Sequence, residues 1–185
     1  PFVSAADFGY DPYAATPFFR EALYALIYGT TPGPTSITGQ FSGGSLLFPF
    51  NDDESFREGS VINVRDYLGN YARTFGQRVP ASGNARAIRA WLAGTNAGRG
   101  WMFDALGGSG DPADIASLPL DYYAPGAAVL YSRSGHDANA MEVHVQLGTP
   151  GGVEHRHRDA GNFQVWRKGR WLTRESVGYA ENIAG

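Results

Sequence analysis

Apolar positions in the first part of the chain recur with the period of an α-helix. The first such stripe consists of Phe19, Leu23, Leu26 and Ile27. Thr16 can cap a helix that has Pro17 at its first position, and Gly29 is a residue at which helices commonly end. The spacing therefore predicts a helix with one apolar face between Thr16 and Gly29.

Two further helices are predicted before residue 95, after a connection over 30–44 that is rich in Pro, Gly, Thr and Ser. One runs over about 61–75. Its apolar face consists of Val64, Leu68, Tyr71 and Phe75. The other has Asn84 as its cap and Gly94 at its end. Its apolar face consists of Ile88, Trp91 and Leu92.

The period changes to that of β-strands after Pro119. Residues 128–132 form a short apolar run with strand character. Apolar and polar residues then alternate strictly over 141–147, which predicts a half-buried antiparallel strand with Glu142, His144 and Gln146 on its polar side. Residues 162–167 and 170–173 predict a hairpin about the turn Lys168-Gly169.

The order of helices first and strands second predicts an α+β fold. We expect a helical portion over residues 1–119 and a sheet portion over residues 120–185. The predicted helices are short and are followed by long loops, so they should pack against other helices, some of them outside this chain.

Charge and composition exclude several classes of protein. The formal net charge of −3 gives no global basic field for nucleic acid, and no apolar run is long enough to span a membrane. Six basic residues nevertheless gather near the C-terminus, and they form either an anion-binding cluster or a solvated sheet face. They are Arg156, Arg158, Arg167, Lys168, Arg170 and Arg174.

The absence of cysteine excludes disulfides and thiolate metal sites. The N-terminal residues carry neither an initiator Met nor a signal sequence, and the chain looks like a piece of a longer protein.

The segment His155-Arg156-His157-Arg158-Asp159 is the strongest chemical signal in the sequence. In an extended segment alternate residues share a face, so His155, His157 and Asp159 would point the same way. Two imidazoles and a carboxylate suit metal binding or proton transfer, because histidine titrates near neutral pH and is a common metal ligand. Surface histidines in a loop are the alternative interpretation.

The run over 151–179 resembles a stretch characteristic of heparinase II/III-like polysaccharide lyases, a superfamily that includes alginate and glycosaminoglycan lyases. The family pattern is a His-x-His-x-Asp motif, a strand, a Lys-Gly turn, a second strand and an acidic residue ahead of Gly-Tyr. The matching residues are His155, His157, Asp159, Gly161, Phe163, Lys168-Gly169, Leu172, Glu175 and Gly178-Tyr179. The similarity continues upstream to the segment from Leu118 to Tyr123, whereas the helical part is similar in character only.

This resemblance implies the C-terminal part of an incomplete α/α toroid followed by the start of an antiparallel β-sandwich, with substrate in the cleft between them. It implies β-elimination on a uronic-acid-containing polysaccharide or oligosaccharide, in a periplasmic or secreted bacterial enzyme. The remaining part of the same enzyme, or a companion chain, would supply the rest of both domains. No nucleic acid partner and no membrane span are expected.

Residue roles follow from the resemblance position by position. His155 would be the catalytic histidine, and His157 a ligand of a structural zinc ion. Glu175 would be a second zinc ligand, at a position where the family more often has Asp. A third ligand would come from outside this chain, unless His136 or His144 substitutes for it. The catalytic tyrosine would be Tyr13 or Tyr10, which precede the first predicted helix.

Two other functions remain open from the residues alone. One is a non-catalytic, zinc-stabilised carbohydrate-binding or structural module, which needs His157 and Glu175 but not His155 or the tyrosines. The other is a metal-dependent hydrolase, in which His155, His157 and Asp159 would all bind one ion.

Overall fold

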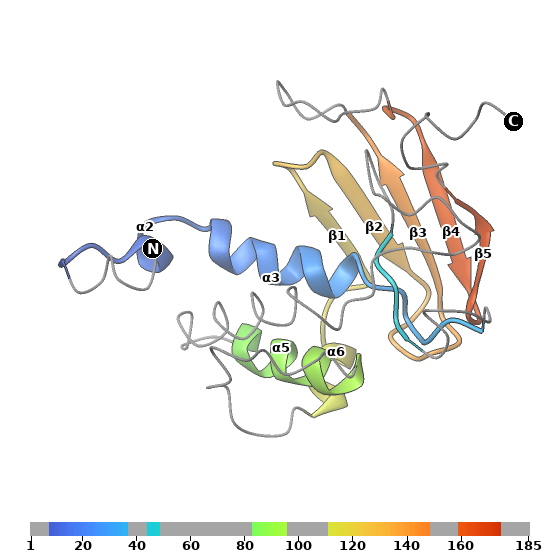
Figure 1. The fold of residues 1–185 in the computed structure, drawn as a ribbon, viewed down its shortest axis with the longest axis horizontal. Helices are drawn as coiled ribbons and strands as arrows, with labels where there is room; N and C mark the ends of the chain where they lie inside the picture. The colour runs from blue at the N-terminus through green and yellow to red at the C-terminus, as the bar shows by residue number, and fades with distance from the viewer. Residues whose placement is uncertain (1–7, 37–43, 49–82, 96–110, 149–158, 175–185) are drawn as a thin grey trace, which may run out of the picture. The chain divides into compact units, whose positions relative to one another are not determined.

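A computed structural model describes residues 8–36, 44–48, 83–95, 111–148 and 159–174 (Figure 1). The chain forms two compact units. Among the described residues, those up to Ile27 and those over 83–115 belong to one unit, and those over 28–48 and from Ala116 onward belong to the other.

The first unit contains short helices. They are α2 (Pro12–Ala15), most of α3 (Phe18–Tyr28), α5 (Gly83–Gly94) and α6 (Pro112–Ala116). The predicted first helix is confirmed: the Phe18 amide donates to Thr16 Oγ1 at 3.2 Å, as expected of a cap. Phe19, Leu23 and Ile27 of the predicted stripe are buried.

Helix α5 confirms the helix predicted between Asn84 and Gly94. Ile88 and Trp91 are buried, and the helix ends at Gly94. An ion pair of 3.1 Å joins Arg86 Nε to Asp114 Oδ1 and so links α5 to α6. The helix predicted over 61–75 lies outside the described residues. In the part of the chain that the structure describes, no helix is long and apolar enough to cross a membrane.

The second unit is built on an antiparallel sheet of five strands in the order β1-β2-β3-β4-β5 (Figure 1). They are β1 (Asp121–Ala124), β2 (Val129–Arg133), β3 (Met141–Gln146), β4 (Phe163–Arg167) and β5 (Arg170–Thr173). The predicted strands and the hairpin are confirmed, with ends that differ from the prediction by at most one residue. Strand β1 is one more strand, which the apolar pattern did not predict. Helices followed by an antiparallel sheet confirm the α+β class.

The burial of β3 is the reverse of the prediction. Glu142, His144 and Gln146 are buried, whereas Met141 is 38% exposed and the valines between them are only partly buried. The expectation that these polar residues form the solvent side of the strand is wrong. An additional layer of chain covers that face of the sheet, and this layer gives no periodic signal in the sequence.

The covering layer consists of residues 29–36 and 44–48, which we call the strap. Its two parts pair with each other, because the Thr31 amide donates to the Leu46 carbonyl at 2.7 Å and the Phe48 amide donates to the Gly29 carbonyl at 2.9 Å. Leu46 and Phe48 form a buried cluster with Trp166 of β4. The sequence predicted only a connection here, and in the structure it completes the core beneath the sheet.

The opposite face of the sheet is apolar and partly open. Leu130, Val143, Val145 and Val165 lie on it as register partners and are partly buried, while Tyr123 and Phe163 are 50% and 55% exposed. An apolar sheet face of this kind is usually buried against another layer of secondary structure.

Candidate active site

The His-x-His-x-Asp segment lies in the connection between β3 and β4, and the described residues show how the ends of that connection are held. The Gly161 amide donates to the Gln146 carbonyl at 2.7 Å, and the Gln146 amide donates to the Asn162 carbonyl at 2.9 Å. A turn closes where the Asn162 amide donates to the Asp159 carbonyl at 2.8 Å. The last residue of the motif, Asp159, therefore lies beside the end of β3.

Gln146 also organises this end of the sheet through its side chain. Its buried amide group donates to the Ala127 carbonyl at 3.0 Å and to the Gly148 carbonyl. The first contact reaches the turn between β1 and β2, and the second reaches the start of the connection that carries the motif. One glutamine therefore joins the turn between β1 and β2 to the start of the connection between β3 and β4.

His144 is buried on the covered face and is held on several sides. Gln164 Nε2 lies 3.0 Å from His144 Nδ1, the Tyr131 ring stacks on the imidazole at 5.2 Å, and Phe48 meets it edge-on at 5.5 Å. Burial lowers the pKa of this imidazole to about 4. His144 is thus a neutral histidine of the core.

A buried contact between an arginine and a carboxyl group lies on the same face. Arg133 Nη2 is 2.9 Å from Glu142 Oε2, and both side chains are almost fully buried. Burial raises the pKa of the Glu142 carboxyl to about 8, although the charge and hydrogen bond of Arg133 act in the opposite direction. Burial therefore shifts both Glu142 and His144 toward their neutral forms.

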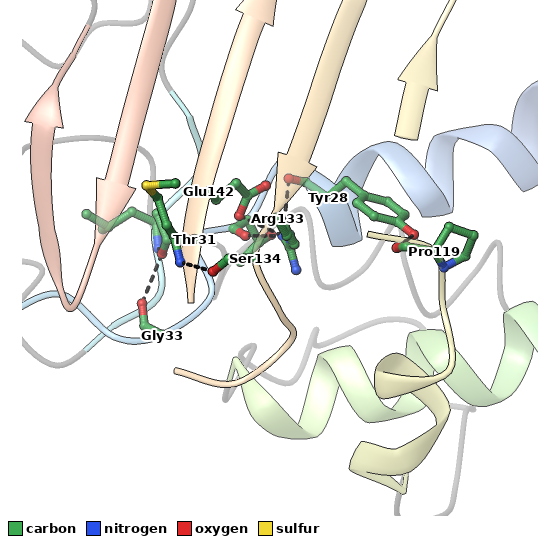
Figure 2. A network of polar contacts seen from close by, with 10 residues as sticks. Tyr28, Thr31, Gly33, Pro119, Arg133, Ser134 and Glu142 are labelled. Atoms are coloured by element: carbon green, nitrogen blue, oxygen red, sulfur yellow. Dashed lines mark hydrogen bonds and ion pairs between the residues drawn. The ribbon is translucent and has the colours of Figure 1, made fainter. Parts of the chain in front are cut away.

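Figure 2 shows how this pair ties the strap to the sheet. Arg133 Nη2 donates to the Thr30 carbonyl at 2.6 Å and to the Tyr28 carbonyl at 3.2 Å, and its guanidinium lies 5.4 Å from the centre of the Tyr28 ring. The Tyr28 hydroxyl donates to the Pro119 carbonyl at 2.6 Å. Thr31 Oγ1 donates to the Gly33 carbonyl at 3.0 Å and so fixes the next bend of the strap.

The predicted catalytic and metal residues are only partly within the described chain. His155, His157 and Glu175 lie outside the described residues. Tyr10 is described and its side chain is 59% exposed. Tyr13 lies on α2, but its side chain is outside the described part. The roles assigned to these five residues remain predictions.

The predicted zinc ligands His157 and Glu175 also lie outside the residues that the structure describes. Within the described ranges, no three His, Asp or Glu side chains gather as a metal site would require. His136 Nε2 contacts the Leu118 carbonyl at 3.0 Å, and His144 is held by Gln164. Among the residues that the structure describes, neither of the two substitutes considered for the third zinc ligand therefore belongs to a cluster of metal-binding side chains.

The described part of the site is a scaffold for the motif. Sequence patterns did not indicate the Arg133–Glu142 pair or the core position of His144, because both depend on the strap. One sequence feature could have indicated that this face is buried: the polar residues of β3 have aromatic residues as partners on the neighbouring strands. Tyr131 pairs with His144, and Trp166 pairs with Glu142.

No protein-family model matches the chain, and no curated protein sequence matches it either. Among solved structures, the chain is similar to heparan sulfate lyase HepC from Pedobacter heparinus, with 20% sequence identity and a TM-score of 0.54 over 85% of this chain and 19% of that one. It is also similar to heparinase III, with 17% identity and a TM-score of 0.55 over 86% of this chain and 21% of that one.

The likeness at these identities is one of fold, and the chain spans about one fifth of the length of the two lyases. It agrees with the resemblance drawn independently from the motif and the Lys-Gly hairpin. In its fold, this is a partial heparinase-like chain.

Proposed function

We propose that this chain is part of a polysaccharide lyase that cleaves a uronic-acid-containing polysaccharide or oligosaccharide by β-elimination. The observation that carries the proposal is the position of the His-x-His-x-Asp motif in a heparinase-like fold. The motif follows β3, and its last residue is tied to the start of β4 by the turn from Asp159 to Asn162. Similarity of fold and similarity of motif thus point to the same reaction class.

The reaction sets clear demands on the site. A base removes the proton from C5 of the uronate, a double bond forms between C4 and C5, and the C4–O4 bond breaks as an acid protonates the leaving oxygen. The C5 proton is weakly acidic, so polar or cationic groups must stabilise the charge that develops on the carboxylate. In our proposal His155 and one tyrosine act at C5 and O4, and the remaining polypeptide neutralises the carboxylate.

Tyr13 and Tyr10 are the candidates for that tyrosine. They lie close together in sequence, just ahead of α3, and Tyr10 has an exposed side chain that a substrate could reach. We favour Tyr13, because the approach to a helix is a position from which a ring can project into a binding site. Activity assays of the Tyr10→Phe and Tyr13→Phe variants distinguish the two candidates.

Zinc would have a structural role in this enzyme. His157 and Glu175 offer an imidazole nitrogen and a carboxylate oxygen, which are ligands that zinc accepts. We propose that the third ligand comes from the remaining polypeptide. When bound, the ion would cross-link the segment before β4 to the segment after β5.

The two-domain architecture is also a proposal. The apolar outer face of the sheet, with Tyr123 and Phe163 half exposed, supports a second sheet packed there as in a β-sandwich. The short helices α3 and α5 support the end of an α/α toroid. The rest of both domains would belong to the same enzyme or to a companion chain, in the periplasm or outside the cell.

The experiment is an assay of the complete parent protein on heparan sulfate, alginate and hyaluronan. A double bond conjugated to the uronate carboxylate absorbs in the ultraviolet, so β-elimination is detected directly. We expect one polymer to give this signal and His155→Ala to abolish it while bound zinc is retained. Tyr13→Phe should lower kcat by at least a hundredfold, the usual contribution of a general acid or base being about 10²–10⁴.

Tyr123→Phe is the matched control, because Tyr123 is an exposed tyrosine with no role assigned in catalysis or zinc binding, and the exchange keeps the ring that would pack against a second sheet. It should leave the rate unchanged. Zinc binding without an unsaturated product from any uronate polymer would contradict the lyase proposal and favour the binding module.

A further inference from the structure

The turn between β4 and β5 concentrates positive charge on an acidic protein. Arg167, Lys168 and Arg170 are all exposed and occupy three of four consecutive positions, with Gly169 as the fourth. We call these four residues the basic turn; it joins the two strands at one edge of the sheet (Figure 1). The chain as a whole has a formal net charge of −3, so this cluster does not reflect a generally basic surface.

The charges in the basic turn repel one another. Arg167 and Arg170 are register partners, so their side chains start from directly opposite positions on neighbouring strands. Like charges at such positions destabilise a hairpin. Among the residues that the structure describes, no carboxylate forms an ion pair with Arg167, Lys168 or Arg170.

The backbone of the turn adds a second unfavourable feature. Lys168 has φ of 49° and Gly169 has φ of 79°, the left-handed pair of a two-residue hairpin turn. Such turns favour Asn, Asp or Gly at the first position, because a lysine side chain is strained there. A strained lysine between two opposed arginines is a local conflict of the kind that marks functional positions.

The strap holds the basic turn in place. The Gly169 carbonyl accepts hydrogen bonds from the Ser36 amide at 2.9 Å, from Ser36 Oγ at 3.2 Å and from Thr35 Oγ1 at 3.3 Å. Arg170 Nε donates to Ser36 Oγ at 3.3 Å, which orients that guanidinium. The cations are therefore presented on an anchored turn, and less conformational entropy is lost when they bind a ligand.

We propose that the basic turn binds carboxylate or sulfate groups of an acidic polysaccharide, at a subsite separate from the reacting uronate. Two guanidinium groups supply planar, paired donors that suit both anions, and Lys168 adds a third positive charge. Bound anions would offset the repulsion between Arg167 and Arg170.

This subsite lies at the far end of β4 from Asp159, the last residue of the motif. Strand β4 runs from Phe163 to Arg167, roughly 13 Å at the usual rise per residue, and Asp159 lies before its start. A chain that touches both places must be several sugars long. This inference rests on the proposed lyase function and adds that long substrates bind better than short ones.

The test compares binding of long and short chains. The complete parent protein carrying His155→Ala is titrated with labelled heparan sulfate and alginate, as long chains and as tetrasaccharides, at fixed ionic strength. Arg167→Gln with Arg170→Gln should weaken binding of the responding long chain about tenfold and leave the tetrasaccharide unchanged. It should also make the affinity less dependent on salt.

The matched control is Arg20→Gln with Arg86→Gln, which removes the same charge from exposed arginines on helices. The Arg167/Arg170 variant should unfold at about the same urea midpoint as the parent protein, because relief of the like-charge pair offsets loss of the Arg170–Ser36 hydrogen bond. Weaker binding at an unchanged midpoint is then a loss of anion contacts. Equal effects of the two double variants, or an equal loss for the tetrasaccharide, would overturn the proposed subsite.

The same proteins distinguish failure of the subsite from failure of the proposed function. An unsaturated product from the parent protein, with long-chain binding unaffected by the Arg167/Arg170 exchange, would remove the subsite and leave the lyase. Weaker long-chain binding in the variant, with no unsaturated product from the parent protein, would leave an anion-binding turn and remove the lyase.

Discussion

At the scale of single residues, the core beneath the sheet contains polar groups that contact one another. Arg133 contacts Glu142 and two backbone carbonyls, and His144 contacts Gln164. Burying such groups is costly unless each has a partner, so loss of one member harms the others. The arginine has the largest number of these contacts and should be the least replaceable.

Arg133→Met should therefore lower the free energy of unfolding by about 3 kcal/mol or more, because it leaves Glu142 and two carbonyl groups without their donor. Glu142→Gln should cost less at neutral pH, since a carboxyl with a pKa near 8 is already largely protonated and glutamine resembles that form. Urea unfolding of both variants measures the difference. An equal or larger loss for Glu142→Gln would show that the carboxylate is charged in the fold.

Stability should depend on pH through the same two groups. Glu142 has a folded pKa of about 8, above its ordinary value of 4.5. Between these pH values the folded state keeps a proton that the unfolded chain releases. The free energy of unfolding therefore falls as the pH rises from 4.5 to 8. His144 has a folded pKa of about 4, below its ordinary 6.5, so stability is lost as pH falls between 6.5 and 4.

The two effects oppose each other in mildly acidic solution, and only that of Glu142 remains from about pH 6.5 to pH 8. Over that window the free energy of unfolding should fall by up to about 1.4 kcal/mol per pH unit. Urea midpoints measured across the range test this. Glu142→Gln should flatten the slope, and a slope that survives in this variant must come from another group.

At the scale of elements, local patterns predicted most of the helices and strands and failed on the environment of β3. Thr16 and Gly94 mark helix ends through backbone preferences that act locally, and the Lys168-Gly169 turn fixes its hairpin in the same way. The burial of Glu142 depends instead on the strap, more than ninety positions earlier in the chain. Its Pro-, Gly- and Thr-rich sequence has no period, so no local pattern could indicate which face of the sheet it covers.

The contact between strap and hairpin can be tested at Gly169. A Cβ at this position would lie 2.9 Å from the Ser36 amide nitrogen and 3.1 Å from the Pro34 carbonyl oxygen, at a φ of 79°. Gly161 has a similar φ of 91° but open space around it. Gly169→Ala should therefore destabilise the protein by about 1 kcal/mol more than Gly161→Ala, which reports backbone strain alone.

Thermal or urea unfolding of the two variants gives this difference. If Gly161→Ala is as harmful as Gly169→Ala, the close approach of Ser36 to the turn contributes nothing beyond the backbone conformation.

At the scale of the whole molecule, the sequence motif and the fold lead to the same group of proteins by independent routes. The motif residues His155 and His157 predicted a heparinase-like chain, and 86% of the chain has the fold of part of heparinase III. What the sequence could not predict is how the ends of the connection that carries the motif are held, such as the pairing of Gln146 with Gly161 and Asn162, because these contacts join residues on either side of a loop without periodic pattern.

The central claim is that the complete parent protein breaks a glycosidic bond by elimination. The most direct measurement is the mass of the products released from the responding uronate polymer, with the His155→Ala variant as control. The account predicts fragments whose new non-reducing end is an unsaturated uronate, formed without uptake of water and absent from the variant. Fragments that have gained a water molecule at each break would contradict it and establish hydrolysis instead.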